Sequence, residues 1–176
     1  MEYFLKSRRL GFRYWTNQDF PLAQALWSDS KVTGLFGGPF SPEMVRTRLA
    51  NEIRMRDECG IQYWPIFLLE DHQHVGCAGL RPYLAKKNAW ELGYHLHPGL
   101  WGQGLATEAA FAVLAHAFST SSVETIFAGH HPSNEASRRV LGKLGFEYVG
   151  DEFYAPSGVV EPIYVLHRED WCSHQQ

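Results

Sequence analysis

The sequence of 176 residues contains few cysteines, no excess of basic residues and no long hydrophobic run. Its three cysteines, Cys59, Cys77 and Cys172, are far apart and form no CxxC pair, which excludes a disulfide framework and a zinc ribbon. Lysine and arginine number 16 against 19 acidic residues, so the clustered basic surface of a nucleic-acid binder is missing. We therefore expect a soluble protein of a reducing compartment, the cytoplasm, that binds neither nucleic acid nor membrane.

The composition is that of a folded chain. Hydrophobic residues make up 45% of the sequence and charged residues 20%, a balance typical of globular proteins. The length suits one domain with a substantial core, and the sequence contains no internal repeat, low-complexity segment or linker. It therefore predicts a single domain over residues 1–176.

The hydrophobic periodicity predicts an alternation of helices and strands. Leu10, Phe12 and Tyr14 alternate with polar or small residues and predict a strand over 8–15. Ser41 followed by proline predicts the start of a helix that runs to about Glu58. The other predicted elements are helices at 20–27, 105–119 and 134–144, the last capped by Ser133, and strands at 61–69, 74–80, 89–96, 125–129, 146–154 and 162–167. This order predicts a mixed α/β architecture with one central sheet.

The segment from Tyr94 to Ala109 carries the clearest functional pattern. A strand leads into a turn with glycines at 99, 102 and 104, and a helix begins directly afterwards. Glycines allow a tight turn and a close approach of the backbone to a ligand, while the first N–H groups of a helix are unpaired and carry a partial positive charge. Such a helix start suits a phosphate group, although a glycine-rich turn is also an ordinary way to begin a helix. The segment is neither a Walker A loop nor a full dinucleotide motif.

Two segments resemble signatures of the GNAT acyltransferase superfamily. Residues 101–106 resemble its acetyl-CoA loop, inside the phrase P-x-x-W-G-Q-G-L-A-T-E-A, and residues 134–146 resemble a second signature, N-x-x-S-x-x-V-L-x-K-L-G-F. Residues 9–13 resemble the opening of the family and residues 164–171 its closing strand and tail. Among GNAT branches, the chain is similar to the RimJ and RimL type of ribosomal-protein N-terminal acetyltransferases. Because the signatures occur in the family's order, together they are far more specific than either alone.

The resemblance implies a mostly antiparallel mixed sheet with helices on both faces, splayed between the strands at 89–96 and 125–129. Acetyl-CoA is then the acyl donor, with its pantetheine arm in the gap. Backbone groups at Leu96 and His97 would hold pantetheine and thioester, and the Asn134 side chain would bind the arm or serve only as a first-turn polar residue. The residues implied at the pyrophosphate are Trp101, Gly102, Gln103, Gly104, Leu105, Ala106 and Thr107. Many family members carry glutamine or arginine in place of Trp101, a departure of little consequence where backbone amides make the contacts.

Two residues are candidates for the chemistry of acyl transfer to an amine, which needs a neutral nucleophile and a proton for the departing sulfur. Ser137 lies one turn after Asn134, on the same helix face, and resembles the general acid of related enzymes; alternatively it is a small packing residue. Glu91 shares a strand face with Gly93, which leaves space next to it, and with His95. Its carboxylate is a candidate base or amine anchor, or a structural carboxylate that only fixes geometry.

Four histidines are alternative bases. His95 and His97 share one strand face, but no third ligand lies near them in the sequence, so no metal site is predicted. His130 and His131 follow the strand at 125–129, where they would line an acceptor pocket or belong to an ordinary loop. Aromatic residues that could shape an acceptor site, but are more typical of a core, are Phe36, Tyr63, Trp64 and Trp90.

The sequence thus predicts an acetyl-CoA-dependent N-acetyltransferase that works by direct attack of a primary amine in a ternary complex, without a metal or a covalent enzyme intermediate. The resemblance makes a protein N-terminal amine the first choice of acceptor. The alternatives are a small amine, such as a polyamine, an amino acid or an antibiotic, and a non-catalytic sensor that binds acyl-CoA. The sequence makes no prediction about the oligomeric state.

Overall fold

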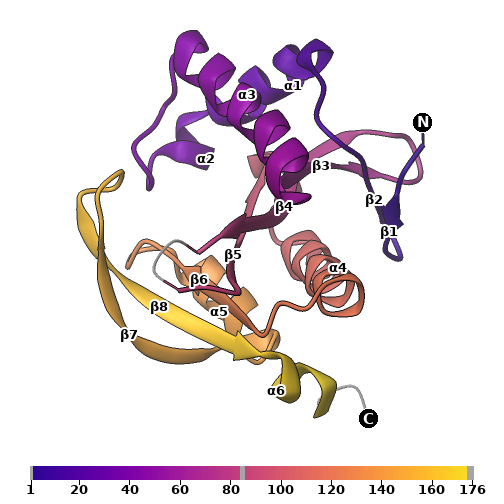
Figure 1. Ribbon diagram of the computed structural model, residues 1–176. Helices are drawn as coiled ribbons and strands as arrows, with labels where there is room; N and C mark the ends of the chain where they lie inside the picture. The colour runs from indigo at the N-terminus through magenta and orange to yellow at the C-terminus, as the bar shows by residue number, and fades with distance from the viewer. Residues whose placement is uncertain (1, 84–85, 174–176) are drawn as a thin grey trace.

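One sheet of eight strands runs through the protein (Figure 1). The structure is a computed structural model that describes residues 2–83 and 86–173. The strand order is β1-β2-β3-β4-β5-β6-β8-β7, and β5 and β6 run parallel while the other neighbours are antiparallel. The strands are β1 (Leu5–Lys6), β2 (Leu10–Phe12), β3 (Tyr63–Leu68), β4 (His74–Pro82), β5 (Ala89–Leu96), β6 (Thr125–Gly129), β7 (Glu147–Tyr154) and β8 (Val159–His167). This confirms the predicted mixed, mostly antiparallel sheet.

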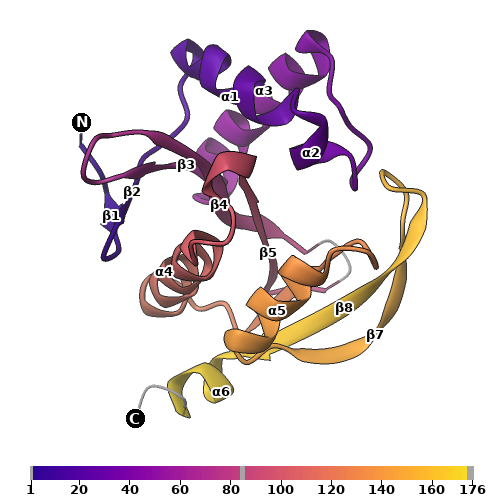
Figure 2. The same cartoon turned by 180° about the vertical axis from the view of Figure 1, so that it is seen from behind.

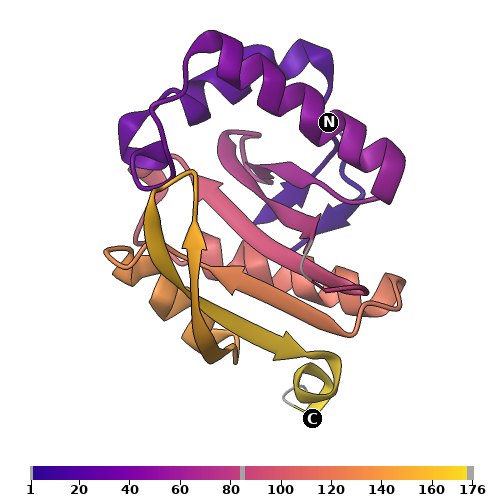
Figure 3. The ribbon, with the colours of Figure 1, turned by 60° about the vertical axis from the view of Figure 1, so that its left-hand side comes forward.

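Helices cover both faces of the sheet. In Figure 3, α1 and α3 lie on one side of it, and α4 and α5 lie on the other. The helices are α1 (Phe20–Trp27), α2 (Ser30–Thr33), α3 (Pro42–Cys59), α4 (Leu105–Thr120), α5 (Glu135–Lys143) and α6 (Arg168–Ser173), with 3-10 turns at Asn17–Asp19 and Pro98–Leu100. Each face has its own hydrophobic cluster, one built mainly around α4 and one around α1 and α3. Among the described residues, none of these helices is both long and apolar enough to span a bilayer.

The sheet separates in its middle, as the resemblance implied. β5 and β6 are paired only from Ala89 opposite Thr125 to Glu91 opposite Phe127. Beyond Glu91, β5 continues to Leu96 beside β4, while β6 continues beside β8. Figure 2 shows the β7–β8 half turning away from the β1–β5 half, with α5 beside the gap. Among the described residues, the part of β5 after Glu91 therefore has no strand neighbour on its β6 side.

Local signals explain where the helices begin and end. The Ser41 side chain accepts a hydrogen bond from Met44 N–H at the start of α3, which confirms the predicted cap, and Gly60 ends that helix in the left-handed conformation. At α5 the prediction was wrong by one residue. Asn134, not Ser133, is the N-cap, because its Oδ1 accepts the hydrogen bond from Ser137 N–H.

The N-terminal region contains the largest differences from the predicted elements. The strand predicted over 8–15 is limited to Leu10–Phe12, because the following chain leaves the ladder: Trp15 N–H donates to the side chain of Gln62. The short strand β1 and the four-residue helix α2, capped by Asp29, were not predicted. Both elements are too short to show a hydrophobic period.

Candidate active site

The N-terminus of α4 is open to a ligand. Gly104 is its N-cap, with φ +77° and ψ 4°, and Gly102 also has a positive φ. No side chain of the described residues caps this helix, whereas α3 and α5 have side-chain caps. Glu108 N–H makes the first bond of the helix, to Gly104 C=O, so the amides from Leu105 to Thr107 have no acceptor within it. These free N–H groups and the helix dipole suit a phosphate group.

The turn before α4 is held by contacts that the sequence did not reveal. The Trp101 indole N–H donates to Leu96 C=O at 2.8 Å, and the Arg9 guanidinium donates to Gln103 C=O at 3.1 and 3.2 Å. Trp101 therefore fixes the shape of the turn with its ring. Leu105 is buried, Ala106 packs against the core, and Thr107 lines a neighbouring groove.

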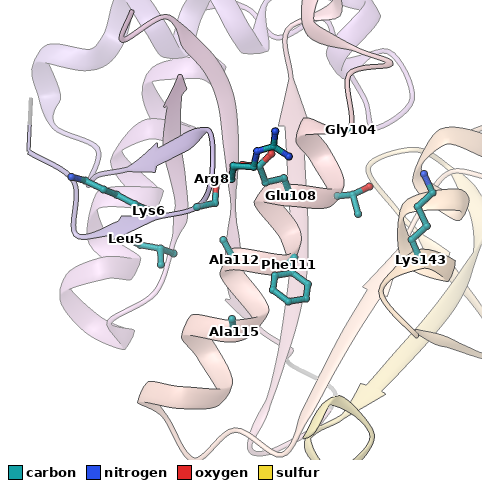
Figure 4. Close-up of a pocket in the computed structure, with 11 residues that line it drawn as sticks. Leu5, Lys6, Arg8, Gly104, Glu108, Phe111, Ala112, Ala115 and Lys143 are labelled. Carbon is teal, nitrogen blue, oxygen red and sulfur yellow. The ribbon is translucent and has the colours of Figure 1, made fainter. Parts of the chain in front are cut away.

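Glu108 ties the first turn of α4 to the β1–β2 connection. Its Oε1 accepts hydrogen bonds from Ser7 Oγ–H and Arg9 N–H, and its Oε2 accepts one from Arg9 Nε–H, each at 2.7 Å. Burial opposes ionisation of this carboxyl, but the bonds from Ser7 and Arg9 outweigh it and lower the pKa of Glu108. Glu108 lines an adjacent groove of about 700 Å³. Figure 4 shows it between Gly104 and the β1 segment. Glu108 was not predicted as a functional residue from the sequence, although it lies inside the first signature.

We expect Glu108→Gln to lower the free energy of unfolding by about 1–3 kcal/mol at pH 7, because a charged acceptor of three hydrogen bonds is lost. The lowered pKa gives the sign of the pH dependence. The contribution is present above the unfolded-state pKa of glutamate, about 4.3, and is lost as the pH falls through the lower folded-state value. Urea unfolding at pH 7 and in acid should therefore show that the difference in the free energy of unfolding between the wild type and Glu108→Gln is smaller in acid. Glu58→Gln, which affects an exposed ion pair with Arg54, is the control and should change little.

Of Leu96 and His97, the two residues predicted to bind the pantetheine arm, only Leu96 presents its backbone to the gap. His97 N–H donates to Val75 C=O on the β4 side at 3.0 Å, so this group is already bonded within the sheet. Successive residues of a strand direct their backbone groups to opposite edges. Leu96 N–H is therefore directed to the β6 side, where the sheet has separated.

The start of α5 brings Asn134 and Ser137 together with a third residue. Asn134 uses Oδ1 as the cap, which leaves its amide N–H groups free of partners among the described residues. The Ser137 hydroxyl lies 2.8 Å from the Tyr94 hydroxyl, which also approaches Ser137 C=O at 3.4 Å. Tyr94 extends from β5 to α5, and burial raises the pKa of its phenol to about 12. The alternation of β5 places Tyr94 on the face opposite Glu91 and His95, but nothing in the sequence indicates this contact.

Glu91 lies on the opposite face of β5, toward α3. It is half-buried, and no group in the described part of the chain hydrogen-bonds to its carboxylate. Burial raises the pKa of Glu91, Arg81 opposite it on β4 opposes this shift, and Glu161 on β8 adds to it. The expectation that Gly93 leaves free space beside Glu91 was wrong. A Cβ on Gly93 would overlap the Tyr63 hydroxyl, which fills that position.

A buried ionic network fixes the neighbours of Glu91. Glu52 on α3, 1% exposed, accepts a hydrogen bond from Tyr63 N–H at 2.8 Å and forms ion pairs with Arg81 and, at 3.7 Å, with Arg48. Arg81 also lies over the Tyr63 ring. Glu52 was not predicted from the sequence, although its position three residues after Leu49 places it on the buried stripe of the predicted helix.

The two histidines at the end of β5 contact different partners. The Nδ1 atom of His95 accepts a hydrogen bond from the Trp27 indole N–H, and the Nε2 atom of His97 lies 3.1 Å from His74 Nδ1. Residues 2–83 and 86–173 contain no group of three potential metal ligands.

The other two histidines belong to the β6–α5 loop. His130 is buried with its Nδ1 near His131 C=O and its ring stacked on Tyr164, and His131 Nδ1 accepts a hydrogen bond from Ser133 N–H. Among the aromatic candidates, Tyr63 and Trp64 belong to the core, Trp90 is partly buried against it, and Phe36 stacks on His95.

Comparison with known proteins identifies the class to which this arrangement belongs. The family described as "Acetyltransferase (GNAT) domain" matches residues 9–147 of this sequence, so the chain belongs to the GNAT acetyltransferase family. It is an acyltransferase of a family whose acyl donor is acetyl-CoA.

Among individual proteins, the chain is 29% identical over 148 residues to the N-acetyltransferase YoaA of Bacillus subtilis, covering 83% of this chain and 84% of YoaA. A GNAT acetyltransferase from Bacillus anthracis has a similar structure, with a TM-score of 0.81, 25% identity and coverage of 94% of this chain and 98% of that one. The fold also matches that of the ribosomal L7/L12 α-N-protein acetyltransferase RimL in complex with coenzyme A, with a TM-score of 0.80, 18% identity and coverage of 96% and 99%.

Proposed function

We propose that this protein transfers the acetyl group of acetyl-CoA to a primary amine by direct attack in a ternary complex, and that the acceptor is a protein N-terminal amine. One observation carries the catalytic part. Glu91 and Ser137 flank β5 from opposite faces, beside the gap that opens between β5 and β6 after Glu91. A base and an acid are thus available on two sides of one acyl-donor site.

The residues present fit acetyl-CoA. The free amides from Leu105 to Thr107, presented by Gly102 and Gly104, supply donors for a pyrophosphate. Leu96 N–H and the free amide of Asn134 supply donors for the pantetheine arm from the two sides of the gap. His97 was also predicted to bind this arm, but its N–H is hydrogen-bonded to Val75 C=O, so we assign the backbone contact to Leu96 alone.

The chemistry needs two proton transfers. The amine nitrogen forms a bond to the carbonyl carbon of the thioester, and the bond from that carbon to sulfur breaks. The Glu91 carboxylate takes the proton that the amine loses, a role suited to a carboxyl whose pKa is raised by burial. Ser137 Oγ–H, oriented by the Tyr94 hydroxyl, donates a proton to the departing sulfur. Solvent then returns a proton to Ser137 and takes the proton held by Glu91, so both groups regain their starting states.

The choice of acceptor rests on two similarities. The chain resembles the RimJ and RimL type in its motifs, and it shares the fold of RimL, an enzyme described as acting on the α-amino group of ribosomal protein L7/L12. A small amine is the second candidate, since one fold can serve many acceptors. A non-catalytic sensor is disfavoured by the placement of Glu91 and Ser137.

The test is release of free coenzyme A thiol from acetyl-CoA, measured with a panel of peptide N-termini, polyamines, amino acids and amino-group antibiotics. Rapid thiol release with peptides supports the proposal, and release with another class alone assigns the acceptor to that class. Binding of acetyl-CoA without release for any amine would make the protein a sensor and would overturn the catalytic proposal.

We expect Ser137→Ala to lower kcat while the dissociation constant for coenzyme A changes little, since one neutral hydrogen bond is worth about 1 kcal/mol. The defect should shrink with an acyl donor whose thiol is more acidic, because that leaving group needs less protonation. Tyr94→Phe removes the partner hydroxyl and should give a smaller loss with the same dependence on the donor. Pre-steady-state rates with two donors provide the measurement. Equal defects for both donors would show that Ser137 only positions the thioester.

A further inference from the structure

His95 is held by contacts that define its protonation. It projects from β5 on the face directed toward α1 and α3, where its Nδ1 lies 3.3 Å from Trp27 Nε1 and 3.7 Å from Cys77 Sγ. The Phe36 ring stacks on the imidazole with a centroid distance of 4.5 Å. The edge of the Tyr63 ring approaches from β3. The imidazole therefore has a single orientation with one nitrogen directed into the protein.

The neighbours of Nδ1 are hydrogen-bond donors. An indole N–H can donate but cannot accept, so Nδ1 must present a lone pair to Trp27. Burial raises the pKa of the Cys77 thiol to about 12, so this group also keeps its proton. Burial lowers the pKa of His95 well below its usual value, and Arg48 on α3 and Arg81 on β4 lower it further. The ring is therefore neutral, and its proton is on Nε2.

The Nε2–H group is left without a hydrogen-bond acceptor among the described residues. Within residues 2–83 and 86–173, no hydrogen bond to this atom is found, and it is not among the buried, unpartnered nitrogens, which are Arg48 Nε, Trp64 Nε1, His74 Nε2, Arg81 Nε and His130 Nε2. A donor is thus available to a ligand. The groups suited to coenzyme A lie at the gap edge of β5 and on its α4 and α5 side, so the ligand that reaches His95 on the other face is the acceptor.

We infer that His95 is a specificity-determining residue: a fixed N–H donor that recognises an oxygen of the acceptor and is not the catalytic base. Glu91 and His95 are four residues apart on one strand, about 13 Å along it, with the Tyr63 hydroxyl over Gly93 between them. The two groups cannot both contact the reacting nitrogen. His95 therefore meets a more distant carbonyl oxygen, which a peptide has and a polyamine lacks. This inference rests on the proposed acetyl transfer.

The first experiment requires no turnover. In ¹⁵N NMR spectra of the histidine side chains in the free protein, His95 should show the Nε2–H tautomer and no titration near the ordinary histidine value of about 6.5, because burial lowers its pKa well below that value. With coenzyme A present, the dipeptide amide Ala-Ala-NH₂ should shift the His95 Nε2 resonance, whereas hexylamine, a chain without oxygen, should not. An Nδ1–H tautomer, an imidazolium that titrates near pH 6.5, or equal shifts with both amines would overturn the inference.

Kinetics of two matched variants provide the second experiment. His95→Gln keeps an N–H donor at a position close to Nε2, whereas His95→Asn places its amide close to Nδ1 and leaves no donor for the acceptor. Relative to hexylamine, His95→Asn should lose about fivefold in kcat/KM for Ala-Ala-NH₂, and His95→Gln should retain most of the preference. The acidic limb of the pH profile should stay unchanged in both variants. Disappearance of the acidic limb, or equal losses of kcat/KM for both amines, would contradict the inference. An Nε2–H tautomer at His95 without release of coenzyme A thiol for any amine would overturn only the proposed function.

Discussion

Replacing Glu91 with glutamine is expected to lower kcat by about 10²- to 10⁴-fold, the range that a positioned general base contributes. Glutamine has the same shape but cannot take the proton of the amine. Because burial raises the pKa of Glu91, wild-type activity should fall with decreasing pH at values above the ordinary glutamate pKa of about 4.3. In Glu91→Gln this acidic limb of the pH–rate profile should vanish, so that only the titration of the acceptor amine still changes the rate. Rates across pH with a saturating acceptor provide the measurement.

Glu152→Gln is the matched control for this change. Glu152 lies on β7 opposite Glu161, and its carboxylate accepts a hydrogen bond from the Tyr83 hydroxyl with an O···O distance of 2.9 Å, so it already has a partner. The control should keep kcat within about twofold, since it removes one exposed hydrogen bond. Wild-type rates in Glu91→Gln at every pH would assign Glu91 a structural role and leave the base to be found among other groups.

Replacing Gly104 with valine is expected to weaken acetyl-CoA binding by about 100-fold or more, because a branched side chain would stand between the free amides of α4 and the pyrophosphate. Calorimetric titration measures the affinity. With φ +77° at Gly104 any side chain is strained, so the substitution also lowers the stability of the fold. A loss of stability must therefore be separated from a loss of binding.

The chain contains a suitable control in Gly60, which ends α3. It has φ +73° and ψ 2°, nearly the conformation of Gly104, and a Cβ there would meet no described atom within 4 Å, while one on Gly104 would only touch Arg9 Nη2 at 3.8 Å. Gly60→Val should therefore lose similar stability, about 1–2 kcal/mol or more, and keep its affinity for acetyl-CoA. Equal affinity in Gly104→Val and Gly60→Val would show that the α4 turn does not bind the cofactor.

The fold and the α4 turn were predictable because local chemistry determines them. The uncapped glycine turn, the alternation of β5 and the Ser41 cap depend on residues that are neighbours in sequence, and each matches the structure. Motif resemblance added the splayed sheet, which no local pattern contains. The cap of α5 was misplaced by one residue because Ser133 and Asn134 are both good N-cap residues.

The surroundings of the candidate catalytic groups could not be predicted in the same way. Contacts such as Tyr94 with Ser137, Tyr63 over Gly93 and Trp27 with His95 join residues 30 to 68 positions apart, on elements that meet only in the folded sheet. An acidic residue among apolar neighbours, such as Glu52, shows no sign of its partners until α3 is placed against β4.

Only three residue pairs join β5 to β6, so this contact is a seam between two halves of the sheet, β1–β5 and β6–β8. Within each half the strands are paired over longer stretches, as in β4 with β5 and β6 with β8. Little backbone bonding opposes a small rotation of one half against the other. A molecule seated in the seam, bonded to β5 on one side and to α5 on the other, would supply the connection that the sheet lacks. Under the proposed binding mode the acyl donor thus acts as a removable strand, and part of the rigidity of the working enzyme comes from its substrate.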